Sequence, residues 1–430
     1  MAISPARTAA FDILLQVERE DAYASELLHG ARYANLSSAD HGLATELVMG
    51  VLRWRSRLDE AIARESSIRF SKIDFEVVTA LRMAAYQLFY LERVPQRAAI
   101  HESVELVKRA RKSSAAPFAN AVLRKLAEQD KFDSVDLAHP AWLVERWSKE
   151  YGDAVAWKIC EYDQRIPQTT IRIFDAAAIS ELENEGVKLE PGGFLASAYR
   201  VASGDITKTS AFVQGRVAIQ DEGSQLVALL AGKGKRILDC CAAPGGKTRI
   251  LARRNPDAKV VAVELHQHRA ELLRRLVSEK NVEAIAADVC ELPVGEGFDC
   301  VLADVPCSGT GTLAHNPEIK WRLKPEDLSD LQARQLSILQ AAMKQVAPGG
   351  RLTYSTCSLE REENEEVVER ALTTNPEFRL QDCRVELKRL HDEGELRAAD
   401  VDALTQGEYV RTIPGVQACD GFFAAVLRRD

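Results

Sequence analysis

The stretch from Arg236 to Thr248 constrains the fold of this chain more than any other, because an apolar run breaks there at a glycine-rich turn. It reads Arg-Ile-Leu-Asp-Cys-Cys-Ala-Ala-Pro-Gly-Gly-Lys-Thr. The pattern predicts a strand that turns directly into a helix, which brings backbone N–H groups and the positive end of the helix dipole toward a ligand. The spacings of the phosphate-binding loop and of the three-glycine dinucleotide fingerprint are both absent. The stretch therefore predicts a nucleotide-type pocket without saying which nucleotide it takes.

The segment from 216 to 430 continues this pattern as alternating strands and helices. We predict strands at 235–239, 259–264, 283–287, 299–304 and 351–355, followed by an antiparallel hairpin made of 408–414 and 421–427. Alternation of this kind is typical of a parallel sheet with helices on both faces.

The first half of the chain differs in character. Residues 1–138 show helical spacing of apolar side chains throughout, which predicts an all-α bundle, and residues 139–215 predict a small α+β module. The expected fold class is thus multidomain, with an α/β catalytic domain at 216–430.

Composition excludes several classes of protein. The 430 residues contain no apolar run long enough to span a bilayer and no signal-peptide core, so we expect a cytoplasmic protein with no membrane partner. Nine cysteines without a Cys-x-x-Cys pair favour reduced thiols and no metal site.

The charge distribution limits how the chain could meet nucleic acid. The net charge is −8, while residues 1–140 carry 19 Lys+Arg against 19 Asp+Glu. An RNA partner would therefore meet local basic patches. Two are candidates: Arg53, Arg55 and Arg57 around Trp54, and the run Lys108–Lys112.

Acidic residues end three successive strands of the predicted sheet, namely Glu264, Asp288 and Asp304. One such residue is usually a helix cap or a solvated loop residue, but three at the edge where α/β sheets bind ligands indicate a binding site. Glu264 is placed for a ribose diol and Asp288 for an adenine amino group. A dehydrogenase could use the same two acids, but its pyrophosphate needs a different glycine spacing.

With the turn, these acids resemble the S-adenosylmethionine pocket of class I methyltransferases. The turn residues of that pocket are Cys241, Ala242, Ala243, Pro244, Gly245, Gly246 and Lys247.

Two cysteines, Cys307 and Cys357, lie in polar, turn-forming loops at the same edge, whereas most cysteines near apolar strands are small buried hydrophobes. Carbon 5 of cytosine becomes nucleophilic when a thiolate adds to C6 while an acid holds N3. Asp304, Cys307 and Cys357 supply that inventory. Spacing alone leaves open which cysteine attacks.

The motifs together resemble those of RNA cytosine-5 methyltransferases. The match covers Cys241–Lys247, Asp304–Gly309, Lys320–Arg322 and Ser355–Ser358. Residues Ala99–Lys108 and Pro117–Arg124 are similar to the RNA-binding domain of NusB. This architecture resembles the RsmB family, which methylates a cytosine of bacterial 16S rRNA.

The resemblance implies roles for individual residues. Cys357 would be the nucleophile, Cys307 would assist product release, and Asp304 would hold the base edge. Lys247 would contact the target base or order its loop. Glu264 stands where many relatives carry Asp, and one more methylene should still reach the ribose.

The implied cofactor is S-adenosylmethionine, and the implied partner is 16S rRNA, bound by a monomer. A duplex hides C6 in the base stack, so the target is expected in a loop or flipped out.

Three alternatives stay open at this point. The chain could methylate a cytosine of tRNA, which only the NusB-like segment disfavours. It could be a NusB-like assembly factor with an idle methyltransferase domain, although Asp304, Cys307 and Cys357 would then have no use. A dehydrogenase is the weakest alternative, because both loop cysteines would be without a role.

Overall fold

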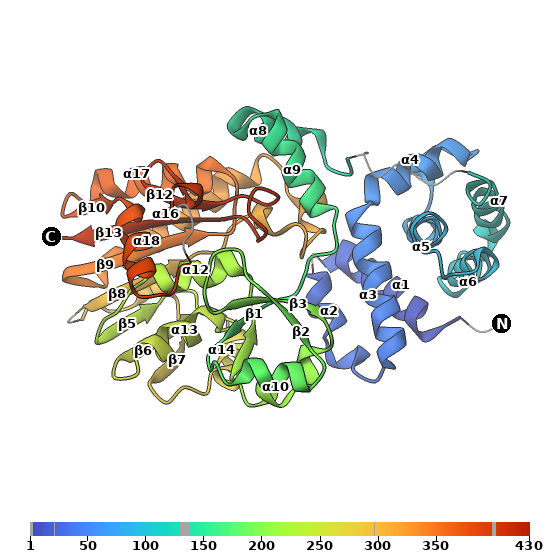
Figure 1. Cartoon of the computed structure of the whole chain (residues 1–430). Helices are drawn as coiled ribbons and strands as arrows, with labels where there is room; N and C mark the ends of the chain where they lie inside the picture. The colour runs from blue at the N-terminus through green and yellow to red at the C-terminus, as the bar shows by residue number, and fades with distance from the viewer. Residues whose placement is uncertain (1–2, 21, 130–136, 296, 398–400) are drawn as a thin grey trace. The chain divides into compact units, whose positions relative to one another are not determined.

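The computed structural model describes residues 3–20, 22–129, 137–295, 297–397 and 401–430. Contacts divide the chain into two units. The helical unit consists of residues 1–166 together with 313–322, and the sheet unit consists of residues 167–312 and 323–430. Figure 1 labels the helices and strands of both units. Among the described residues no helix is both long enough and apolar enough to cross a membrane.

The helical unit is built around α5 (Phe75–Tyr90), whose side chains are nearly all buried. Its other helices are α1 (Pro5–Glu20), α2 (Ala24–Leu28), α3 (Ser38–Arg53), α4 (Arg55–Glu65), α6 (Gln96–Arg109), α7 (Ala116–Leu126), α8 (Ala141–Tyr151), α9 (Asp153–Asp163) and the short α15 (Ile319–Arg322). One apolar core runs from α1 to α7. The predicted helical bundle is confirmed.

The segment 313–322 leaves the sheet unit and folds into the helical unit. Lys320 is 1% exposed, and its ammonium donates to the carbonyl of Arg53 at 2.9 Å. Trp321 donates to the carbonyl of Leu52 at 2.5 Å. Burial lowers the pKa of Lys320 to about 7, although the Asp163 carboxylate opposes this shift. A segment quoted above as a methyltransferase motif is thus anchored by buried hydrogen bonds in the helical unit.

The same anchoring corrects our hypothesis that Arg53, Arg55 and Arg57 form a patch for RNA phosphates. Arg53 is 3% exposed and donates to the carbonyl of Ala314 at 3.3 Å. Arg55 makes a two-bond pair with Glu18, and Arg57 donates to Glu60. Sequence proximity suggested a shared surface, but helix geometry turns Arg53 inward and gives the other two acidic partners.

A four-stranded antiparallel sheet opens the sheet unit, in the order β2-β3-β1-β4. Its strands are β1 (Thr170–Ile173), β2 (Lys188–Pro191), β3 (Ala198–Ser203) and β4 (Val217–Ile219), joined by the helices α10 (Ala178–Asn184) and α11 (Ser210–Val213). Apolar side chains from these strands and both helices form a core of their own.

The main sheet has the order β11-β12-β13-β9-β8-β5-β6-β7, and β10 pairs with β13. Its strands are β5 (Arg236–Asp239), β6 (Lys259–Glu264), β7 (Val282–Ala286), β8 (Phe298–Asp304), β9 (Val346–Thr356), β10 (Phe378–Gln381), β11 (Thr405–Gln406), β12 (Tyr409–Thr412) and β13 (Phe422–Arg429). The strands β7, β6, β5, β8 and β9 run parallel, and β13 is antiparallel to β9. The order reverses at β5, which makes the β5–β8 boundary the topological switch point of the sheet.

Alternating side chains send the strands' apolar residues to two separate cores. Ile237 and Leu302 pack with α12 (Glu222–Leu230), α13 (Gly246–Arg254) and α18 (Cys383–Asp392). Leu238 and Val301 pack with α16 (Asp327–Lys344) and α17 (Glu365–Thr374) on the other face. Helix α14 (Gln267–Leu276) covers β6 through Leu273. The predicted doubly covered sheet is confirmed.

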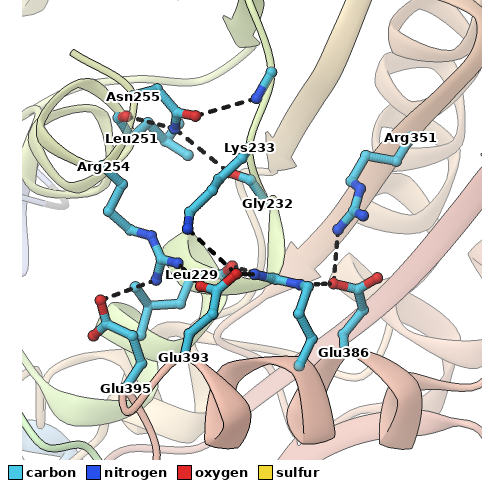
Figure 2. A network of polar contacts seen from close by, with 12 residues as sticks. Leu229, Gly232, Lys233, Leu251, Arg254, Asn255, Arg351, Glu386, Glu393 and Glu395 are labelled. Carbon is cyan, nitrogen blue, oxygen red and sulfur yellow. Dashed lines mark hydrogen bonds and ion pairs between the residues drawn. The ribbon is translucent and has the colours of Figure 1, made fainter.

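A network of charged side chains ties α18 to strands of the main sheet (Figure 2). Glu386 is 2% exposed and accepts hydrogen bonds from Arg351, Arg389 and Gln381, each at 2.7 Å. Burial penalises the charged form of Glu386, but the arginines outweigh it and lower the pKa of this carboxyl. Glu393, the residue after α18, pairs with Lys233 at 3.3 Å and with Arg254.

We expect Glu386→Gln to destabilise the sheet unit by about 3 kcal/mol, because it leaves the buried guanidinium of Arg351 without its carboxylate. Hydrogen exchange of the β9 and β13 amides would measure the loss. The folded-state pKa of Glu386 is depressed, so its contribution is full above the unfolded value and disappears as the pH falls through the folded value. Glu369→Gln, at an exposed position of α17, serves as the control. Equal exchange rates in wild type and Glu386→Gln at neutral pH would contradict the prediction.

Candidate active site

The parallel strands bring the predicted site residues to one edge of the main sheet. Asp239, Glu264 and Asp304 are the last residues of β5, β6 and β8, and Asp288 follows β7 by two residues. Cys357 directly follows β9. Since the carboxyl ends of parallel strands share an edge, residues more than a hundred positions apart in sequence meet there.

The loop after β5 is held in one conformation by backbone and packing. Gly245 has a φ of 114°, and a Cβ at this position would lie 2.4 Å from Val277 and 2.7 Å from Leu273. Only glycine fits this combination. The next residues begin α13, so the first N–H groups of that helix lie at the sheet edge. Below the loop, Asp239 is 1% exposed and accepts a hydrogen bond from Thr248 at 2.7 Å.

An ion pair joins the loop after β5 to the end of β8. The ammonium of Lys247 lies 2.7 Å from the Asp304 carboxylate and 5.2 Å from the centre of the Phe422 ring. Burial disfavours the charged form of Lys247, but Asp304 and, more weakly, Cys357 outweigh it and raise the pKa of the lysine. The other oxygen of Asp304 accepts from the Ser355 hydroxyl at 2.5 Å. Lys247 is therefore a fixed cation whose charge also acts on Cys357.

Cys307 and Cys357 lie together, with their sulfur atoms 3.4 Å apart. Both are partly exposed, whereas the residue after each of them, Ser308 and Ser358, is buried. The hydrogen bond to Cys357, burial, and the charges of Cys357 and Glu363 all raise the pKa of Cys307 well above its usual value. The pair thus presents two accessible thiols, of which Cys307 is held in the protonated form.

The two remaining acids lie on the other side of β5. Glu264 is 4% exposed, accepts from the backbone N–H of His266 at 3.1 Å through Oε1, and lies 3.9 Å from Arg269. Asp288 accepts from the backbone N–H of Cys290 at 2.8 Å through Oδ1, which is the helix-cap arrangement considered above. In each residue, one carboxylate oxygen accepts from a backbone N–H, and this hydrogen bond orients the side chain.

Sequence reasoning missed a buried carboxylate beneath the two cysteines. Glu363 is fully buried and accepts hydrogen bonds from Ser308 and Ser358. It belongs to the run Arg361-Glu-Glu-Asn-Glu365, in which nothing in the charge pattern separates it from its neighbours. Phe422 beneath Lys247 was missed as well, because β13 follows Lys247 in sequence by more than 150 residues.

Comparison with family models divides the chain into three matched regions. Residues 4–128 match the NusB family, and residues 139–206 match the RsmF/B-like ferredoxin-like domain. Residues 226–428 match the model described as 16S rRNA methyltransferase RsmB/F. The dehydrogenase alternative is thereby overturned.

Relatives match along nearly the whole chain. A probable ribosomal RNA small subunit methyltransferase B of Bacillus subtilis is 33% identical, over 98% of each chain. Ribosomal RNA small subunit methyltransferase B of Vibrio cholerae is 30% identical, over 98% of this chain and 97% of its own.

Among solved structures, the crystal structure of PH0851 shares the fold, with a TM-score of 0.80 at 24% identity over both whole chains. NSun6 from Pyrococcus horikoshii shares it over 67% of this chain and 98% of its own, with a TM-score of 0.56 at 20% identity. The full-length identity of at least 30% to named relatives and the three matching family models agree, and the chain belongs to the RsmB/F family of 16S rRNA methyltransferases.

Proposed function

We propose that this enzyme transfers a methyl group from S-adenosylmethionine to carbon 5 of one cytosine in 16S rRNA, at the site its family modifies, through a covalent bond between Cys357 and C6. One observation carries the proposal. Two accessible thiols lie 3.4 Å apart, beside the ion pair between Lys247 and Asp304, at the switch point of the sheet. Addition to C6 needs one cysteine sulfur beside groups that hold the base, and this edge supplies both.

The edge of the sheet fits S-adenosylmethionine on its own geometry. The loop after β5 leads directly into α13, so the first N–H groups of that helix lie at this edge, where they would face a ligand. Glu264 would hold the ribose diol and Asp288 the adenine amino group, each through the oxygen opposite the one bound to backbone. When bound, the cofactor supplies an electrophilic methyl group. The chain's residues bind it and orient the base beside it.

The charges around the cysteines support Cys357 as the nucleophile. Lys247 is a cation that interacts with Cys357, so a sulfur attacking from Cys357 would have a positive charge nearby. For Cys307, the hydrogen bond to Cys357, burial and, more weakly, the charges of Cys357 and Glu363 raise the pKa. The Cys357 sulfur forms a bond to C6. The electron pair of C5=C6 shifts to C4=C5, and the pair of C4=N3 moves to N3, which takes a proton from an acid, so that C5 becomes the nucleophilic carbon of an enamine. Asp304 holds the N3 edge of the base.

Release reverses the addition. After C5 carries the new methyl group, its proton leaves to a base, the remaining pair restores C5=C6, and the bond to Cys357 breaks. While Cys357 is bonded to C6 it bears no charge, so two of the causes that raise the pKa of Cys307 are gone. Cys307 then lies beside the adduct, 3.4 Å from the sulfur that must leave, which fits a role in product release.

For substrate binding, we propose that the exposed run Lys108–Lys112 contacts RNA phosphates. Lys108 and Arg109 have 47% and 42% exposed side chains, although Glu105 and Asp12 pair with them. Arg111 is exposed and has a φ of 62°, which turns it out of the end of α6.

Substitution of each cysteine tests the roles proposed for Cys357 and Cys307. With methyl-labelled S-adenosylmethionine and unmodified 16S rRNA, wild type should form 5-methylcytosine, and Cys357→Ala should lose at least about 10³-fold in rate because it lacks the nucleophile. Cys307→Ala should accumulate a protein–RNA adduct visible on a denaturing gel. Cys290→Ser, which removes an exposed thiol of the same unit, is the control. If Cys357→Ala were fully active and Cys307→Ala inactive, Cys307 would be the nucleophile. Methyl transfer to tRNA and not to rRNA would support the tRNA alternative.

Substitution of Glu264 tests its proposed contact with the ribose of the cofactor. Glu264→Gln should raise the Kd for S-adenosylmethionine about 10-fold, because a charge-assisted hydrogen bond to the ribose is weakened. Isothermal titration calorimetry would measure it without RNA. The matched control is Glu283→Gln, an exposed residue of β7 paired with Lys259, which should bind within about twofold of wild type. Unchanged affinity in Glu264→Gln would remove this residue from the pocket.

The salt dependence of RNA binding tests the proposed phosphate contacts of the run Lys108–Lys112. Replacing Lys108 and Arg111 with Gln should lower the slope of log Kd against log salt by about 1 to 2, because up to two phosphate contacts are lost. Filter binding between low and moderate salt would give the slope. Arg55→Gln with Arg57→Gln removes the same charge from the corrected patch and should leave the slope unchanged. The reverse pattern would place the RNA contact at the corrected patch.

A further inference from the structure

Glu363 connects the two loops that carry the cysteines. Its Oε1 accepts from the backbone N–H of Ser308 at 2.8 Å, and its Oε2 accepts from the Ser308 hydroxyl at 2.5 Å and from the Ser358 hydroxyl. Ser308 follows Cys307 and Ser358 follows Cys357. One buried side chain thus holds the residue next to each thiol.

The same carboxylate is fixed from the side of α16 and β9. The side-chain amide of Gln335 donates both to Glu363 at 2.8 Å and to the carbonyl of Pro306 at 3.0 Å. The Tyr354 hydroxyl donates to the backbone carbonyl of Glu363 at 2.6 Å. Cys307 is therefore held on both sides, at Pro306 and at Ser308, by groups that meet at Glu363.

Both oxygens of this carboxyl are hydrogen-bonded, by the Ser308 N–H and the Gln335 amide at Oε1 and by the hydroxyls of Ser308 and Ser358 at Oε2. Bonds to a buried carboxylate are strong, and leaving their donors without an acceptor is costly. Five hydrogen bonds thus meet at the carboxylate of Glu363 and at the Gln335 amide beside it, between the two loops that carry the cysteines.

We propose that Glu363 is a positioning residue of the methylation reaction, which clamps the loops of Cys307 and Cys357 together and sets the distance between their thiols. The inference rests on the proposed function for its catalytic meaning. The clamp itself does not depend on the proposed function, because it concerns only the positions of the two thiols. A displacement of about 1 Å between reacting groups lowers a rate about 10²-fold.

The test uses the full chain without cofactor or RNA. Diamide oxidises two thiols to a disulfide, taking up their two electrons and two protons as the S–S bond forms, and peptide mapping identifies the Cys307–Cys357 bond. In Glu363→Ala this bond should form at least about 10-fold more slowly than in wild type, because the loops lose their common acceptor. Glu363→Gln keeps the volume and one acceptor oxygen, so it should give an intermediate rate, and it decides the question if Glu363→Ala does not fold.

Glu366→Gln is the matched control, since it makes the same change of charge three residues further on, where Glu366 contacts Gln332 and Arg370. Its disulfide rate should equal that of wild type. In methylation assays, Glu363→Ala should lower kcat about 10²-fold and leave the KM for rRNA within about twofold.

The outcomes separate the two proposals. If wild type makes 5-methylcytosine while a folded Glu363→Gln or Glu363→Ala keeps the wild-type disulfide rate and kcat, the clamp is overturned and the proposed function stands. If the disulfide rate falls as expected but wild type makes no 5-methylcytosine, the proposed function fails and the catalytic role of Glu363 fails with it. A fall in both rates supports both.

Discussion

The register between β8 and β9 is the constraint on which the rest of the site depends. The two strands run parallel with Asp304 opposite Ser355, and these residues are also hydrogen-bonded through their side chains at 2.5 Å. Because each strand is followed within three residues by a cysteine, this register brings Cys307 and Cys357 together. A slip of one residue would turn the ends of both strands to opposite faces and separate the thiols.

The surroundings of the two thiols differ: a hydrogen bond to Cys357, burial and nearby negative charge raise the pKa of Cys307. Lys247 provides a cation on the side of Cys357 and is itself held by Asp304. Glu363 provides an anion on the side of Cys307 and is held by the serines that follow both cysteines. In the proposed mechanism this asymmetry keeps one thiol protonated while the other attacks, so the same buried groups that fix the geometry also assign the roles.

Residues 313–322, which lie within the methyltransferase region of the sequence, fold as part of the helical unit. The segment 313–322 directly continues the loop of Cys307. Its buried Lys320 and half-buried Trp321 donate to the carbonyls of Arg53 and Leu52, the last two residues of α3. The basic residues around Trp54 are therefore poor candidates for RNA contacts, since Arg53 is buried and donates to the carbonyl of Ala314 in that segment. The exposed end of α6 is a better candidate because no such segment covers it within the helical unit as described.

The sequence by itself determined the strands, the glycine-rich turn and the acids that end β6 and β8, because period-two and period-3.6 patterns and glycine punctuation are local signals. It also placed both cysteines in loops at one edge. It could not assign Glu363, Ser355 or the burial of Arg53, since each depends on which distant segment packs against it. Tertiary structure decided these features, because hydrogen bonds and charge pairs across a sheet join residues whose separation in sequence carries no pattern.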